Sequence, residues 1–242
     1  MIKKISLFWI LLGLSISSGA ASTDGAIQFM QKLGDQVIQT TQTKHGEEKR
    51  QALRDIFENS VHHTSIAQFV LGKARRALKF VFKEVDDLEK EKQALAHDVK
   101  NSLEEFYKIY KESVTRTYLS SFDRDYKDEV FQATHAKQDG EDGVVVYSTL
   151  DRKNGAPPLN LHWVLKSTEG GLKILDLRVE GVSQAEKERD EAASIIRKHK
   201  DQCKQDGGKF CDLAALKKLT DDHKTLNDEW KKKIRGEAIS VN

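Results

Sequence analysis

The stretch from Leu172 to Glu180 alternates between apolar and polar residues. Leu175, Leu177 and Val179 fall on one side, and the charged residues between them fall on the other. A period of two predicts a strand with one buried face and one face in water. Gly181 ends the alternation, so we expect the strand to stop there.

A helix-start signal follows directly. Ser183 and Glu186 form a capping box, in which the hydroxyl accepts from the N3 amide and the carboxylate reaches back to the cap amide. We therefore expect the strand to lead into a helix that runs to about Lys198.

Two further segments show the same strand period, Val144–Leu150 and Leu159–Ser167. Asn154-Gly155 and Gly170-Gly171 lie in the connections and suit tight hairpin turns. Together these strands predict a three-stranded antiparallel meander. A further short strand is expected between residues 120 and 137.

Before the strands, apolar residues recur at helical spacing. We expect helices over Ala26–Thr40, Glu47–Val61, His62–Gly72 and Lys73–Glu84, with Gly72 as a helix end. The charged residues 86–100 predict a solvated helical face. A clear apolar stripe then follows: Val99, Leu103, Phe106, Tyr110 and Val114. Helices packed on one face of an antiparallel sheet make an α+β protein.

Composition narrows the class of protein. Lys and Arg number 40 and Asp and Glu number 38, which gives a formal net charge of +2 and no strong field for nucleic acid. The two prolines in 242 residues favour long helices. After residue 200 the apolar positions are few, which predicts one or two weak amphipathic helices, with disorder as the alternative for the last ten residues.

The N-terminus resembles an export signal. Lys3 and Lys4 precede the apolar run Ile5–Ile16, which is shorter than the roughly 20 residues of a membrane-spanning helix. Small residues follow, and we expect cleavage after Ala20 or Ala21. We favour cleavage over a retained anchor, and expect an exported, soluble protein.

The two cysteines are close in sequence. Cys203 and Cys211 bracket a segment that Gly207-Gly208 can bend. In an oxidising compartment they favour a disulfide. The alternative is metal binding, but no histidine or second pair of cysteines lies nearby in the sequence.

Few residues suggest catalysis or a resident metal. Ser183 lies in a segment that approximates the G-x-S-x-G nucleophile motif, but the expected strands are antiparallel and only His199 and His223 follow. A helix cap accounts for this serine. His62 and His63 are adjacent, and adjacent residues point in different directions on a helix, so they do not form a chelating pair. We expect no enzyme activity and no cofactor.

The run Ile174–Ser183 (ILDLRVEGVS) closely resembles the signature of the MlaC (toluene-tolerance) family of periplasmic phospholipid-shuttle proteins. The resemblance extends from about Ala26 to about Lys200. It includes Ile66–Gly72 (IAQFVLG), the strand Val146–Leu150 and the aromatic helix that ends near Tyr110. Residues 86–98 and the tail have no counterpart in the family pattern.

The resemblance implies a curved sheet of the cystatin or nuclear-transport-factor type, covered by helices, with phospholipid tails in an apolar cavity between them. It also implies exchange of lipid with an inner-membrane ABC transporter complex and an outer-membrane lipoprotein complex in a Gram-negative periplasm. We expect the protein to be a monomer. On this basis, nine residues are expected to contact lipid: Phe80, Phe106, Tyr110, Val146, Trp163, Leu165, Leu175, Leu177 and Val179.

Two alternatives stay open. A sister branch with the same signature implies a hopanoid or another lipid as ligand, and an exported lipid esterase would use Ser183. We expect residues 1–21 to be a cleaved signal peptide and 22–200 to form the lipid-binding domain. Residues 201–242 would then be a charged extension, partly helical or disordered.

Overall fold

The computed structural model describes residues 22–83, 90–121, 128–152 and 155–236, without the side chains of residues 79–83, 90–92 and 121. The expected signal peptide lies outside these residues. The elements, in chain order, are α1 (Thr23–Thr43), α2 (Gly46–Ser60), α3 (His63–Lys83), α4 (Lys90–Ser121), β1 (Val130–Asp139), β2 (Gly143–Asp151), β3 (Leu159–Thr168), β4 (Gly171–Val179), β5 (Val182–Ser183), α5 (Gln184–Gln205) and α6 (Cys211–Ile234).

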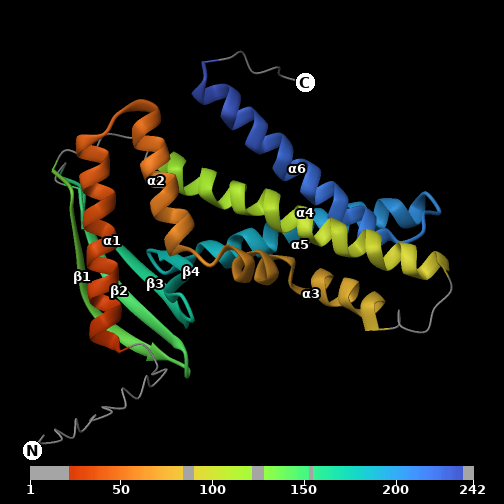
Figure 1. The fold of residues 1–242 in the computed structure, drawn as a ribbon, viewed down its shortest axis with the longest axis horizontal. Helices are drawn as coiled ribbons and strands as arrows, with labels where there is room; N and C mark the ends of the chain where they lie inside the picture. The colour runs from red at the N-terminus through yellow and green to blue at the C-terminus, as the bar shows by residue number, and fades with distance from the viewer. Residues whose placement is uncertain (1–21, 84–89, 122–127, 153–154, 237–242) are drawn as a thin grey trace, which may run out of the picture.

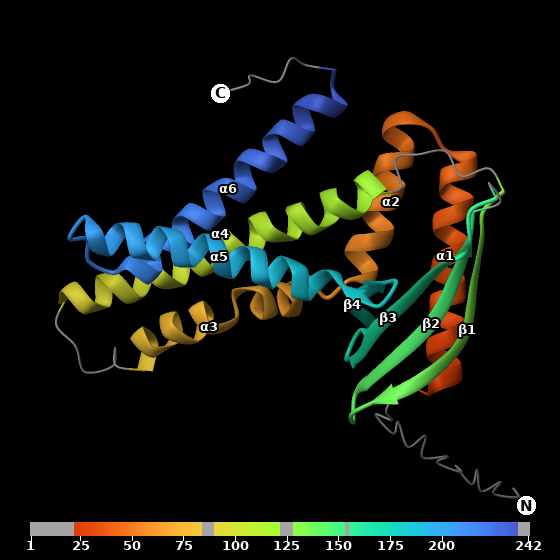
Figure 2. The ribbon, with the colours of Figure 1, turned by 180° about the vertical axis from the view of Figure 1, so that it is seen from behind.

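The sheet is an antiparallel meander in the order β1-β2-β3-β4-β5. The α+β prediction is therefore confirmed, as are the three expected strands. The strand expected between residues 120 and 137 is β1, which has ten residues and is longer than predicted. One face of the sheet carries α1, and none of the described helices lies over the opposite face (Figures 1 and 2).

Helix α1 packs closely against the edge strand β1. The Phe131 ring lies against Gly34, and the Gln31 side chain forms hydrogen bonds to the strand backbone. A Cβ at Gly34 would lie 2.1 Å from the ring of Phe131, so only glycine lets the helix approach this closely. The Gln31 side chain donates to the Phe131 carbonyl (3.2 Å) and accepts from the Ala133 amide (2.8 Å). These bonds satisfy backbone groups that an edge strand would otherwise leave unpaired.

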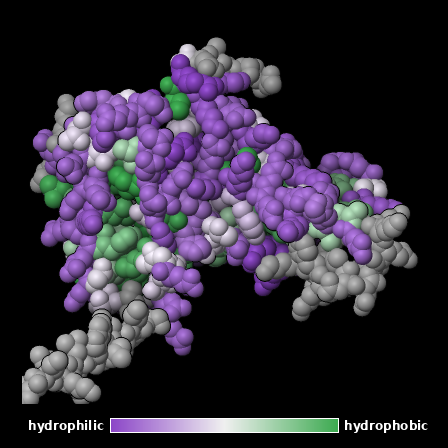
Figure 3. All heavy atoms as spheres, in the orientation of Figure 1, coloured by the Kyte–Doolittle hydropathy of each residue, from purple (hydrophilic) through white to green (hydrophobic). Residues whose placement is uncertain are grey.

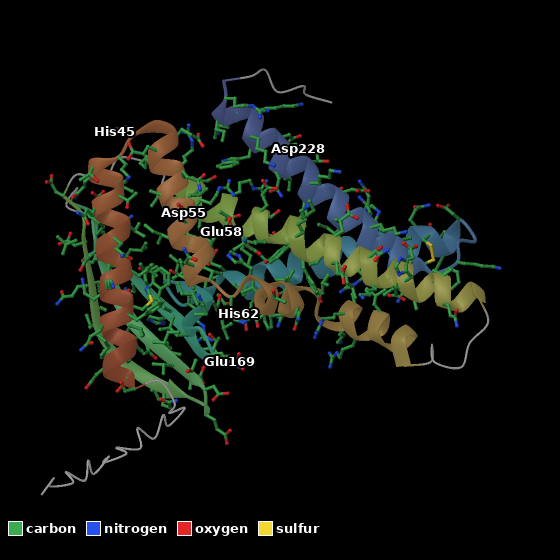
Figure 4. The ribbon with its side chains drawn as sticks, in the orientation of Figure 1. His45, Asp55, Glu58, His62, Glu169 and Asp228 are labelled. Carbon is green, nitrogen blue, oxygen red and sulfur yellow. A yellow bond between two sulfur atoms is a disulfide. The ribbon has the colours of Figure 1, made fainter. Side chains whose placement is uncertain are left out.

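The connection from α2 to α3 is tied to the sheet. The backbone amide of His62, labelled in Figure 4, donates to the Ile174 carbonyl at 2.9 Å. Helix α3 then runs past Gly72, whose backbone is non-helical (φ 48°, ψ −118°). The helix break that the sequence predicts at this glycine is thus a kink inside one element.

Helices α3, α4, α5 and α6 pack together beside the sheet (Figure 2). Helix α6 is better packed than the sequence predicts, since its spaced leucines cover the apolar faces of α4 and α5. Asn227 adds a buried polar link, accepting from the Ser113 hydroxyl and donating to the Ile109 carbonyl, both at 3.1 Å. The buried apolar residues of α6 are Cys211, Leu213, Ala215, Leu216 and Leu219.

A disulfide joins Cys203 to Cys211 across the turn between α5 and α6. Gly208 is needed in this turn because a Cβ there would lie 2.7 Å from the Cys203 sulfur. The covalent link fixes the start of α6 beside the end of α5. The C-terminal helix is therefore attached to the rest of the molecule both covalently and by its core.

Candidate functional site

An apolar cavity of about 320 Å³ lies between α1 and the inner face of the sheet. Its volume is at the lower end of the range of roughly 300–1,000 Å³ found for small-molecule pockets. Apolar surface is visible between α1 and α2 in the space-filling view (Figure 3). Most of the cavity lining is apolar. The apolar lining residues are Met30, Leu33, Gly34, Val37 and Ile38 from α1, Phe57, Ile66 and Val114 from the other helices, and Phe131, Leu150, Leu159, Leu161, Trp163, Leu175, Leu177 and Val179 from the sheet.

Four of the nine predicted lipid contacts line this cavity: Trp163, Leu175, Leu177 and Val179. The sheet register brings them together, since Trp163 pairs with Leu177 on the neighbouring strand. The indole nitrogen of Trp163 donates to the Ser148 hydroxyl at 2.9 Å. Its one polar atom is thereby satisfied, and the ring can present an apolar surface to the cavity.

The side chains of β4 do not alternate strictly between the two faces of the sheet. Its pairing with β3 shifts between Val164 and Leu165, so that both Leu177 and Ile174 lie opposite inward-facing residues of β3. Ile174 is therefore a core residue, with 1% of its surface exposed, although the alternating pattern places it on the wet face. A one-residue irregularity of this kind moves a side chain from one face to the other.

Four other predicted contacts do not border the cavity, and the side chain of the ninth, Phe80, lies outside the described residues. Val146 and Leu165 are fully buried in the core. Phe106 and Tyr110 point toward α6, where they stack on each other at 5.4 Å and both meet the ring of His223 edge-on. The reason is that α6 covers this stripe of α4.

The partly buried His223 makes the folded state sensitive to acid. Burial, with Arg116 nearby, lowers the pKa of His223 from 6.5 to about 4, while Asp222 acts in the opposite direction. Between these values the unfolded chain takes up a proton that the folded chain does not. Stability is therefore lost as the pH falls from about 6.5 to about 4.

We expect the His223→Gln variant to show a smaller loss of stability over this range than the wild type. The measurement is urea unfolding of both proteins at several pH values between 7 and 4. Since burial and Lys111 also lower the pKa of His63 to about 4, the variant should retain part of the slope. Equal slopes in the two proteins would contradict the role of His223.

The cavity has a polar end at the start of α5. Tyr118 stacks on Phe57 at 5.2 Å, and burial raises the pKa of Tyr118, which keeps the phenol neutral. Burial also raises the pKa of Glu188, whose carboxylate accepts a hydrogen bond from the Tyr110 hydroxyl. An apolar chamber with polar groups at one end suits an amphiphilic ligand.

The signature stretch builds this polar end. The Ser183 hydroxyl accepts from the Glu186 amide at 3.0 Å, which confirms the serine half of the predicted capping box, and Asp176 accepts from the Ala185 amide at 3.0 Å. Outside the cavity lining, the carboxylate of the exposed Glu180 accepts from the Asn160 backbone amide at 2.7 Å. Sequence reasoning identified the serine cap but not the two carboxylates, since each binds an amide far along the chain, 9 residues away for Asp176 and 20 for Glu180.

None of the helices formed by the described residues combines the length and hydropathy needed to cross a bilayer. No cluster of three or more histidine, cysteine or acidic side chains suited to holding a metal occurs among these residues.

The fold and the cavity define an α+β binding protein with an apolar chamber between a helix and an antiparallel sheet. The chain belongs to the MlaC protein family, whose model matches residues 28–204. The resemblance seen in the sequence is thus confirmed, and family membership indicates a binding or carrier protein. Helix α6 lies beyond the matched region.

A solved structure with the same fold is a phospholipid-binding protein from Ralstonia solanacearum in complex with a phospholipid. The TM-score is 0.58 at 16% sequence identity, and the alignment covers 84% of this chain and 98% of that one. No curated protein matches the chain significantly.

Proposed function

We propose that this protein is a periplasmic carrier that holds the acyl chains of a phospholipid in the cavity between α1 and the sheet. The observation that carries the proposal is the apolar lining from both sides, with Asp176, Gln184 and Glu188 in the lining beside the start of α5. Membership of the MlaC family and the phospholipid complex of the Ralstonia solanacearum protein support it.

Carriage of this kind needs no chemical step. Burial of acyl chains contributes about 0.8 kcal/mol per methylene, so two chains gain on the order of 20 kcal/mol relative to water. A bilayer offers a lipid about as much. Loading and release therefore require only a small bias, which membrane-bound partners can supply.

The proposed route runs between an outer-membrane lipoprotein complex and an inner-membrane ABC transporter complex, and so maintains the lipid asymmetry of the outer membrane. Export by the N-terminal signal of residues 1–21 would deliver the protein to the periplasm as a monomer. In this proposal residues 22–200 form the lipid-binding domain and residues 201–242 a C-terminal extension.

The direct test is to purify the chain from Ser22 onward without detergent, extract it with organic solvent and analyse the extract by mass spectrometry. We expect diacyl phospholipid at close to one molecule per protein. If a hopanoid is the main lipid in the extract, the ligand belongs to another lipid class and the phospholipid assignment is wrong. A folded protein that contains no lipid would contradict the proposal.

The esterase alternative makes a different prediction at Ser183. Replacement of Ser183 by alanine removes a helix cap and should cost about 1 kcal/mol of stability, while lipid loading is unchanged. Ser183→Asp is the matched control, because aspartate caps a helix but cannot act as a serine nucleophile. Thermal unfolding and lipid content should both be near wild type in Ser183→Asp. Ester hydrolysis by the wild type that both variants lose would instead establish the enzyme.

A further inference from the structure

An open groove between the C-terminal halves of α4 and α6 adjoins the lipid cavity. Its lining includes Arg116 and Ser120 from α4 and Glu229, Trp230 and Lys233 from α6. Helix α6, which forms one wall of the groove, lies beyond the region that the family model matches. Figure 4 shows the diverging end of α6, on which Asp228 is labelled.

The groove and the cavity share Thr117 in their walls. On the same stretch of α4, Val114 and Tyr118 face the apolar cavity, whereas Arg116 and Ser120 face the groove. One helix thus separates an apolar chamber from a polar groove, and the two meet at a single residue. For an amphiphile with its tails in the chamber to place its head in the groove, the head would have to cross beside Thr117.

Arg116 carries a positive charge that is half-buried. Burial lowers the pKa of its guanidinium, while Glu188, Glu229 and Glu112 act in the opposite direction. Two of these carboxylates have other partners: Glu112 pairs with Lys231 at 2.7 Å, and Glu188 accepts from Tyr110. The third, Glu229, lines the groove with Arg116, but among the described side chains it forms no ion pair with the guanidinium.

A half-buried cation has already lost part of its hydration on folding. It therefore gains more free energy from an anionic partner than a fully exposed cation does. Guanidinium groups bind phosphate through two parallel hydrogen bonds, and a lysine adds a mobile positive charge. Lys233 lines the groove from the helix opposite Arg116. The Ser120 hydroxyl offers a further donor.

We propose that the groove between α4 and α6 binds the phosphate group of a glycerophospholipid whose acyl chains occupy the cavity. This inference rests on the proposed function and adds to it a head-group site supplied by α6. Glu229 and Trp230 then lie where they can face a cationic head, since a carboxylate and an indole ring both attract an ammonium group.

The test compares two lipids with identical acyl chains, phosphatidylglycerol and diacylglycerol, which lacks the phosphate. Delipidated protein is incubated with vesicles that contain both, and the bound ratio is read by native mass spectrometry. The test variant is Arg116→Gln/Lys233→Gln. The matched control is Lys209→Gln/Lys224→Gln, which removes the same charge from exposed positions outside the groove.

We expect wild type and control to prefer phosphatidylglycerol, and the test variant to lose that preference by about tenfold, the effect of losing a hydrogen bond to a charged group. Equal selectivity in all three proteins would overturn the head-group site while leaving lipid carriage intact. Failure of the wild type to bind either lipid would instead refute the proposed function.

Inorganic phosphate carries the same anionic group as a phospholipid head and is the other candidate ligand of the groove. Titration with inorganic phosphate, followed by ³¹P NMR line broadening, separates the two sources. Phosphate binding that the test variant loses, together with unchanged lipid selectivity, would overturn the head-group assignment and show a site for the free anion.

Discussion

Replacement of Leu177 by arginine is expected to abolish co-purification of lipid while the protein remains folded. Leu177 lies in the sheet wall of the cavity, paired with Trp163. An arginine there fills part of the space that lipid tails need and places a charge against them, at a penalty of several kcal/mol for an unpaired buried ion. The measurement is the lipid content of detergent-free protein by mass spectrometry, with circular dichroism to verify the fold.

The matched control is Thr149→Arg. Thr149 precedes Leu150, which lines the cavity, so alternation along β2 directs Thr149 to the opposite face of the sheet. This variant gains the same side chain and should retain lipid at the wild-type level. Lipid retained by a folded Leu177→Arg protein would show that the tails do not lie on this wall.

Replacement of Phe106 by alanine should have the largest effect on stability, without a direct effect on the cavity. Phe106 is fully buried between α4 and α6, stacked on Tyr110. Deletion of such a ring lowers the free energy of unfolding by about 3–5 kcal/mol through lost burial and the cavity left behind. Urea unfolding measures the loss, and the folded fraction should still contain lipid.

Phe69→Ala is the control for this substitution. Phe69 is 43% exposed and contacts the Arg189 guanidinium at 5.1 Å from its ring centre. Removal of its ring should cost about 1 kcal/mol or less. Loss of lipid from folded Phe106→Ala protein, with little change in stability, would show that Phe106 lines the cavity. That result would contradict its packing against α6.

The strands and their order could be predicted from the sequence because period-two alternation and glycine turns are local signals. The kink at Gly72 was foreseeable for the same reason. The function of the apolar stripe on α4 was not, since periodicity shows that a face is buried but not what buries it. Phe106 and Tyr110 contact α6, a helix whose sparse apolar residues gave little sign of close packing.

The cavity itself was only half predictable. Its sheet wall follows from β4, although the register shift that buries Ile174 depends on pairing with β3 and has no signature in β4 alone. The opposite wall comes from α1, where Met30, Leu33 and Val37 read as an ordinary amphipathic face. Residues that line a cavity and residues that pack in a core have the same composition, so only the fold separates them.

The most direct test of the central claim is to locate a bound lipid chemically. A phospholipid with a photoactivatable group near the end of one acyl chain is loaded into the wild-type protein, irradiated, and its adducts are mapped by peptide mass spectrometry. The proposed function predicts adducts on the cavity walls, at residues such as Met30, Phe57 and Leu177. Adducts confined to exposed apolar residues such as Val182 and Phe210, with none on the cavity walls, would contradict it.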